Sequence, residues 1–143
     1  IDTLIKHTKM ESAWYLEVAA SMRFISRCYQ HLNRYDEAEI WLKKAIEKSP
    51  NAREPYVEMS FLKYNQKKYL ETIEYLIKAQ QIKKNELLYI NEPFCWDSTI
   101  DDLLSLSYYN LGFKDEAIFY VDKALEYNGN DERLINNKKI FEK

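Results

Sequence analysis

The fold is decided by two matching stretches of sequence, YDEAEIWLKKA at 35–45 and YLETIEYLIKA at 69–79. Aligned on Tyr35 and Tyr69, positions 34 residues apart correspond: Ala38, Leu42, Ala45 and Pro50 against Thr72, Leu76, Ala79 and Lys84. Thr72 and Lys84 depart from the alanine and proline that are usual at their positions, which weakens the register of the second repeat without refuting it. A third copy follows after a shift of 45 residues, as Ala117, Val121, Ala124 and Gly129. A period of about 34 residues is the length of one helix–turn–helix unit, so the chain is predicted to be a stack of such units.

Around these stretches, apolar residues recur three and four places apart, which is the spacing of one helical face. This periodicity predicts helix pairs at about 12–32 and 36–49, at about 54–65 and 69–82, and at about 99–111 and 114–127, with a last helix at about 131–142. Leu134, Ile135 and Phe141 of that last helix suit the covering of an exposed end of the stack. The predicted fold is therefore all-α: a right-handed α-solenoid of about three helix–turn–helix repeats with a C-terminal capping helix.

The predicted domain organisation is a lead-in at 1–10 and one repeat domain at 11–143, with repeats at about 12–50, 51–84 and 98–129. Residues that break the period form an insertion at about 85–97. This insertion is too apolar for a solvated linker, so we expect it to pack on the solenoid, with Phe94 and Trp96 as anchors or as ligand contacts.

Two helix ends have capping signals. Asn51, with Glu54 three residues later, predicts a capping box at the start of the second repeat. Asn128-Gly129 predicts a helix end at which Gly129 takes the left-handed conformation.

Composition restricts the function classes. The 143 residues are 46% apolar and carry a net charge of −2, so neither a disordered tail nor a nucleic-acid-binding protein is indicated. The charge is unevenly distributed, because residues 1–85 hold 15 basic and 11 acidic groups whereas residues 86–132 hold 2 and 11. That asymmetry allows opposite charges to pair either between neighbouring surfaces of the same chain or between copies of it.

The expected location is the cytoplasm. Cys28 and Cys95 are far apart and form no Cys-x-x-Cys pair, which favours a reducing compartment. No apolar run reaches the roughly 18 residues of a membrane span. The first residue is Ile1, so the sequence is expected to be a fragment of a longer polypeptide.

No catalytic residue, metal site or cofactor is predicted. The two histidines, His7 and His31, belong to no cluster with zinc-ligand spacing, and two isolated glycines cannot form a phosphate-binding loop. Cys28 and His31 lie one helical turn apart, which leaves a nucleophile as an alternative, but a small buried thiol is the favoured interpretation. Asp101 and Asp102 diverge by about 100° on a helix and are interpreted as first-turn acids.

Function is expected on the concave face, which the first helix of each repeat lines. The candidate binding residues are Arg23, Arg27, Gln30, Phe61, Tyr64, Asn65, Asp102, Tyr109 and Asn110. Two arginines one turn apart, facing tyrosines and asparagines, suit an acidic or polar peptide. The alternative is that Arg23 and Arg27 pair with nearby acidic residues of the chain or are solvated.

The repeat pattern over about 19–129 resembles the tetratricopeptide repeat family, whose domains are scaffolds for protein interaction. Further sequence features are similar to the C-terminal tetratricopeptide region of bacterial family 2 glycosyltransferases: Ser26-Arg27-Cys28-Tyr29, Tyr35-Asp36-Glu37-Ala38, Arg53-Glu54-Pro55-Tyr56, Glu92-Pro93-Phe94-Cys95-Trp96, Asp102-Leu103-Leu104, Leu111-Gly112 and Asp131-Glu132-Arg133-Leu134 with Asn137. The resemblance implies an accessory, non-catalytic module that positions an acceptor or mediates assembly. A free-standing adaptor that binds a peptide in its groove is the alternative.

The co-chaperone subclass of tetratricopeptide domains holds a C-terminal carboxylate with basic and amide side chains at set concave positions. Those positions are occupied here by Arg23, Arg27, Glu58, Thr99 and Leu103. Because Glu58 and Leu103 do not suit a carboxylate clamp, a receptor for chaperone tails is disfavoured.

Overall fold

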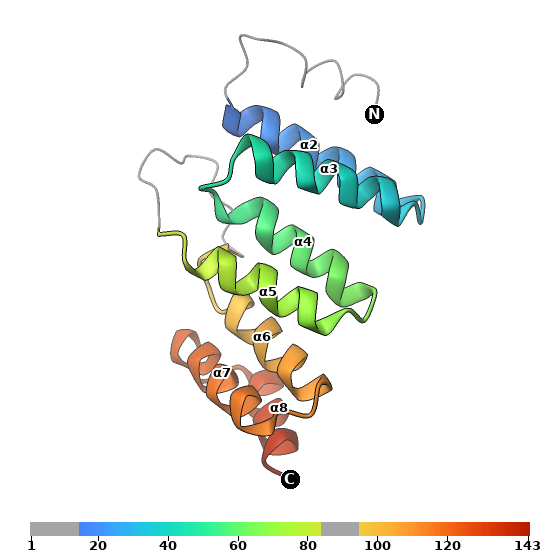
Figure 1. Cartoon of the computed structure of the whole chain (residues 1–143). Helices are drawn as coiled ribbons and strands as arrows, with labels where there is room; N and C mark the ends of the chain where they lie inside the picture. The colour runs from blue at the N-terminus through green and yellow to red at the C-terminus, as the bar shows by residue number, and fades with distance from the viewer. Residues whose placement is uncertain (1–14, 84–94) are drawn as a thin grey trace.

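A computed structural model describes residues 15–83 and 95–143. Over these ranges the regular secondary structure is helical, and there is no strand. The seven helices of the described ranges are α2 (Tyr15–His31), α3 (Tyr35–Lys48), α4 (Arg53–Asn65), α5 (Tyr69–Gln80), α6 (Thr99–Asn110), α7 (Lys114–Tyr127) and α8 (Glu132–Glu142). The helices stack in chain order as antiparallel hairpins, from α2 at one end to α7 and α8 at the other (Figure 1). The predicted all-α solenoid is therefore confirmed.

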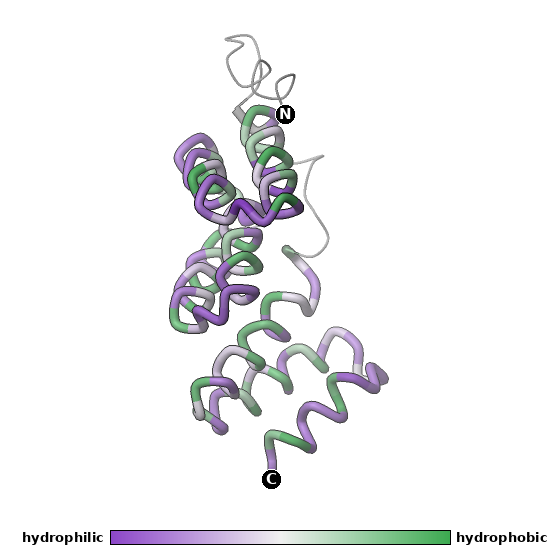
Figure 2. Tube along the Cα trace, turned by 90° about the vertical axis from the view of Figure 1, so that its right-hand side faces the viewer, coloured by the Kyte–Doolittle hydropathy of each residue, from purple (hydrophilic) through white to green (hydrophobic). Residues whose placement is uncertain are grey.

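The second helix of a hairpin packs closely against the first at small residues. Ala38 and Ala45 of α3 are fully buried, as are the corresponding Thr72 and Ala79 of α5. Small side chains at these places let the axes of paired helices approach closely. Apolar and polar residues alternate along the helices (Figure 2), as expected of helices that bury one face.

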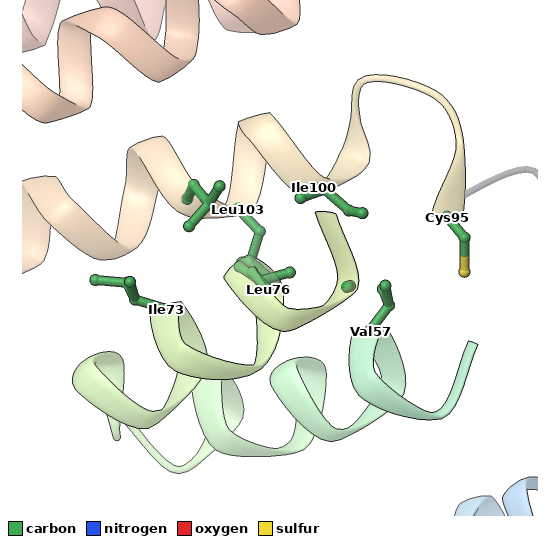
Figure 3. Close-up of a cluster of buried hydrophobic side chains, with 8 residues drawn as sticks. Val57, Ile73, Leu76, Cys95, Ile100 and Leu103 are labelled. Carbon is green, nitrogen blue, oxygen red and sulfur yellow. The ribbon is translucent and has the colours of Figure 1, made fainter. Parts of the chain in front are cut away.

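The central core joins the second hairpin to the third. Ile73 and Leu76 of α5 face Ile100 and Leu103 of α6, and Val57 of α4 lies below them (Figure 3). Four of these five side chains are buried to at least 94%, and Leu103 is 8% exposed. Burial of such side chains, at about 2 kcal/mol each, fixes the position of one hairpin on the next.

The three hairpin turns share one geometry. Asn33, Lys67 and Gly112, which are spaced like the repeats, all have positive φ, of 58°, 60° and 88°. The residue after each donates its amide hydrogen to a carbonyl five residues back, from Arg34 to Tyr29, from Lys68 to Lys63 and from Phe113 to Tyr108. This is the Schellman arrangement, which satisfies the carbonyls at a helix end.

The structure corrects two predicted caps. Residue Ala52, not Asn51, precedes α4 as its N-cap, and no side chain caps that helix. Gly129 does not have positive φ, and α7 ends at Asn128 in extended conformation. The chain instead enters α8 in an extended conformation, with Asp131 accepting hydrogen bonds from the amides of Arg133 and Leu134.

We expect Gly112→Ala to lower the free energy of unfolding by about 1 kcal/mol, because a Cβ disfavours positive φ. No atom lies within 4 Å of the added Cβ, so the cost comes from the backbone alone. Gly129→Ala is the matched control and should change stability little, since its Cβ would meet only Leu125 O at 3.7 Å. Lys67→Gly should stabilise the chain by about 0.5–1 kcal/mol. Urea unfolding measures all three, and equal effects of the two alanine substitutions would contradict the prediction.

A buried lysine ties three helices together. Lys63 of α4 is 5% exposed, and its Nζ lies 2.5 Å from Glu39 Oε1 of α3 and 2.9 Å from Glu71 Oε2 of α5. Burial lowers the pKa of Lys63, but hydrogen bonds to Glu39 and Glu71 outweigh it and raise the pKa overall. For Glu39, burial raises the pKa, and hydrogen bonds from Lys63 and Lys43 outweigh it, so its pKa is lowered.

This network predicts a pH dependence of stability. Because the folded pKa of Glu39 lies below its ordinary value of 4.5, its contribution to stability is present above that pH and is lost as pH falls through the folded pKa. The folded pKa of Lys63 lies above its ordinary value of 10.5, so its contribution is present below that pH and is lost as pH rises through the folded pKa. Glu39→Gln should cost about 1–2 kcal/mol at pH 7. Urea unfolding at a series of pH values measures the difference in free energy of unfolding between Glu39→Gln and the wild type. This difference should become smaller below pH 4.5. A difference that does not change with pH would contradict the prediction.

The last helix covers the end of the stack. Leu134 and Phe141 of α8 are buried against α7 residues, which include Val121. Arg133 pairs with Asp102 of α6 through its two terminal guanidinium nitrogens, Nη1 and Nη2, and Lys138 Nζ lies 2.7 Å from Asp122 Oδ1 of α7. These contacts hold α8 as the predicted capping helix.

The lead-in at 1–10 and most of the predicted insertion, Phe94 included, lie outside the described residues. A search of the described helices finds none long and apolar enough to cross a membrane.

Candidate functional site: a groove between the first helices of the repeats

A groove of about 570 Å³ lies between α2, α4 and α6. Its lining residues are Arg27, Gln30, Glu58, Phe61, Tyr64, Asn65 and Leu103. Arg27 and Gln30 come from α2, the next four from α4, and Leu103 from α6. Five of the nine predicted binding residues therefore line one cavity.

Ion pairs determine the electrostatics of this groove. Arg23 Nη1 donates to Glu58 Oε2 at 2.6 Å, and Arg27 Nε donates to Glu58 Oε1 at 2.6 Å. The side chains of Arg23 and Glu58 are 5% and 7% exposed, whereas that of Arg27 is 43% exposed. Both arginines thus pair with an acidic residue of the chain, the alternative left open by the sequence, and Arg23 lies beneath the groove surface.

The three predicted residues of α6 have other contacts. Asp102 pairs with Arg133 of α8, and the ring of Tyr109 lies 4.6 Å from that of Phe141 between centroids. Asn110 Nδ2 donates to Leu106 O within its own helix. Asp102 and Tyr109 therefore hold the capping helix and are not part of the groove, because α8 occupies that part of the concave face.

Two groove residues, Glu58 and Leu103, were absent from the predicted binding set. They stand 45 residues apart, which is the offset of the third repeat, and so occupy equivalent places on α4 and α6. The sequence analysis had already assigned both residues to concave positions. They were left out of the binding set because neither side chain suits a carboxylate clamp, although a residue can line a groove without belonging to such a clamp.

A second cluster centres on Arg53 at the start of α4. Its guanidinium donates to three carbonyls, to Ile82 O and Cys95 O at 2.8 Å and to Gln80 O at 3.4 Å. The Trp96 ring lies below it, 3.9 Å from the guanidinium carbon to the ring centroid. Burial lowers the pKa of Arg53, which as a guanidinium stays charged near neutral pH. Arg53 thus joins the end of α5 to the segment that leads into α6, and Trp96 contributes to this junction.

A smaller cavity of about 370 Å³ lies on α6 and α7, lined by Asp101, Lys123, Glu126 and Tyr127. Asp101 is 7% exposed and accepts a hydrogen bond from Gln80 Nε2 at 2.9 Å. Burial raises the pKa of Asp101, and the hydrogen bond from Gln80 only partly offsets this effect. Asp101 therefore packs between α5 and α6 while Asp102 pairs with α8, so the two carboxylates serve separate contacts.

The predicted Cys28–His31 alternative gains no support from the structure. Cys28 is half-buried and His31 is exposed, and no hydrogen bond joins the two side chains in the part of the chain that the structure describes. Within 15–83 and 95–143, no three His, Cys, Asp or Glu side chains lie close enough together to hold a metal ion.

Comparison with known proteins agrees with this architecture. The family model described as "Tetratricopeptide repeat" matches residues 24–51 and 102–131, which lie in the first and third hairpins. No curated protein matches the chain. Among solved structures, the chain is similar to the N-terminal domain of stress-induced protein-1 (STI-1) from C. elegans, with a TM-score of 0.76 and 16% identity. That match covers 92% of this chain and 100% of the other. The chain is thus an all-α solenoid in which two segments, 24–51 and 102–131, match the tetratricopeptide repeat model; repeats of that family generally serve protein interaction and are typically non-catalytic.

Proposed function

We propose that this chain is a non-catalytic interaction scaffold that binds a segment of a partner protein in the groove between α2, α4 and α6. The observation that carries the proposal is the groove itself, in which two aromatic rings, two amides and an ion pair converge from three helices. Phe61 and Tyr64 offer apolar area with little rotational freedom to lose, and Gln30 and Asn65 offer donors and acceptors for a peptide backbone. These are the side chains that recognise a polypeptide.

A display library of peptides selected on the wild-type chain tests this proposal. Asn65→Trp should fill the groove and weaken selected peptides by about tenfold or more, because the indole occupies the volume that the ligand needs. Asn136→Trp, on the exposed face of α8, is the matched control and should leave their affinity unchanged. Selected peptides that bind both variants equally well would place recognition elsewhere and overturn the proposal.

We also propose that the chain is the accessory region of a family 2 glycosyltransferase, where it positions an acceptor or mediates assembly. The sequence similarities support this, and Arg53 and Trp96, the most specific of them among the described residues, form one structural junction. The test is the sequence encoded upstream of Ile1 in the native reading frame. Strands and an Asp-x-Asp loop there would support a glycosyltransferase, and their absence would favour a free-standing adaptor.

Location and self-association are further parts of this proposal. The two cysteines of the described chain are free thiols, which suits the cytoplasm. The acidic balance of 86–132 against the basic balance of 1–85 suits association between copies. Sedimentation analysis at low and high salt tests the latter, because association through opposite charges weakens as salt rises.

A further inference from the structure

The groove already contains a carboxylate held by two guanidiniums. Each oxygen of Glu58 accepts a hydrogen bond of 2.6 Å from a different arginine, Oε2 from Arg23 and Oε1 from Arg27. Short charge-assisted bonds of this kind are how proteins hold the carboxylate of a ligand. Here the carboxylate belongs to the chain, and at 7% exposure its side chain is nearly closed off from water.

We propose that Glu58 is an internal carboxylate that occupies the anion-binding position of the groove, so that the groove selects an uncharged partner segment bearing an aromatic or aliphatic side chain. This inference rests on the proposed peptide-binding function and defines its ligand. Glu58 is the residue that determines this specificity.

The charges of the groove lining support this choice. Among the lining residues that the structure describes, Arg27 and Glu58 are the only charged ones, and they pair with each other. A ligand carboxylate would lose hydration and would have to compete with Glu58 for Arg27, whereas a ligand cation would have to compete with two arginines for Glu58. Charged ligands of either sign are therefore penalised, because the opposite charge they need is already paired within the chain.

The neutral part of the lining complements an uncharged segment. The rings of Phe61 and Tyr64 and the side chain of Leu103 can bury an apolar side chain, since all three line the same cavity. The amides of Gln30 and Asn65 can each donate to and accept from a peptide backbone, which needs no charge for recognition.

The wild-type chain tests the inference with matched peptides. The probes are end-blocked peptides with one phenylalanine among asparagine, serine and glycine, and copies in which one neighbour of the phenylalanine is aspartate or lysine. Affinity is measured by fluorescence anisotropy, and occupancy of the groove by shifts of the Phe61 and Tyr64 amide signals in NMR. The uncharged peptide should bind best, and either charge should weaken binding by about tenfold.

Variants at Glu58 test the mechanism. Glu58→Gln removes the internal carboxylate, so the aspartate peptide should gain about tenfold over its uncharged parent, and added salt should reduce that gain. If this variant does not fold, as judged by circular dichroism, the double variant Arg23→Met with Glu58→Gln serves instead, because it also removes the buried cation and leaves Arg27 at the groove surface. Glu74→Gln, on the exposed side of α5, is the control and should leave peptide preference unchanged.

The outcomes separate this inference from the proposed function. Two results would overturn the role of Glu58 while leaving peptide binding in the groove intact. One is that the wild type prefers the aspartate peptide. The other is that the aspartate peptide gains no affinity over its uncharged parent in the folded variant. If no peptide shifts the Phe61 and Tyr64 signals, the proposed function fails and the inference fails with it. An uncharged preference that reverses to aspartate on loss of Glu58 supports both.

Discussion

Replacing Arg53 by alanine is expected to lower the free energy of unfolding by about 3 kcal/mol, one of the two largest effects we predict. The substitution removes three hydrogen bonds from a charged donor to the carbonyls of Gln80, Ile82 and Cys95, and it removes the cation from above Trp96. A carbonyl at a helix end that loses its hydrogen-bond donor lowers the stability of the fold unless a water molecule takes the place of that donor. Arg53→Lys should recover only a small part, because one ammonium cannot reach carbonyls in three directions.

Arg34 supplies the matched control for Arg53. It also lies beside an aromatic ring, with its guanidinium carbon 4.9 Å from the centroid of Tyr29, and it pairs with Glu37. Its side chain is 56% exposed, so Arg34→Ala should cost less than about 1 kcal/mol. Urea unfolding of the three variants measures the difference, and an Arg53→Ala cost as small as that of Arg34→Ala would contradict the junction described here.

Glu58→Gln is expected to cost about 3 kcal/mol, because it takes the carboxylate from between two guanidiniums and leaves the charge of Arg23 in a site that is 5% exposed. Arg23→Met alone should also be destabilising, since Glu58 then keeps only Arg27. The double variant should cost much less than the two single effects added together, because an apolar side chain of similar length replaces the buried cation.

A double-mutant cycle, measured by thermal and urea unfolding at one pH, gives the coupling between Arg23 and Glu58. We expect about 2 kcal/mol or more in favour of the pair. Arg27→Met should be milder, since that side chain is 43% exposed. Additive effects of Arg23→Met and Glu58→Gln would show that the pair does not carry the stability assigned to it.

Local physics explains how much of the fold was predictable. Helix α7 at Lys114–Tyr127 begins and ends where the periodicity predicted. The other helix ends agree with the prediction to within two residues, apart from the start of α2, which borders residues outside the described ranges. These ends follow from side-chain period and turn chemistry, both of which act within a few residues of sequence. The capping box at Asn51 was wrong because α4 begins at Arg53 with Ala52 as its N-cap, so Asn51 lies one residue before the capping position and Glu54 is the second helical residue instead of the third.

The candidate site was predictable only in part. The repeat register placed Arg27, Gln30, Phe61, Tyr64 and Asn65 correctly along one groove, because equivalent positions of stacked repeats face the same side. It also placed Asp102 and Tyr109 on that face, where α8 takes their side chains away from the groove. The repeat register predicts which way a side chain points, but it does not predict whether another helix covers that side chain.

By itself, the sequence determined a helical solenoid built on a repeat of about 34 residues, because helical period and small-residue spacing are local properties. The tertiary structure decided which charges meet. Glu58 lies 35 and 31 residues from its two arginines, Arg53 lies 42 residues from Cys95, and Asp102 lies 31 residues from Arg133. Such pairs form only when the stacking of whole helices brings their side chains within hydrogen-bond distance, and that stacking is set by the summed packing of the core rather than by either partner.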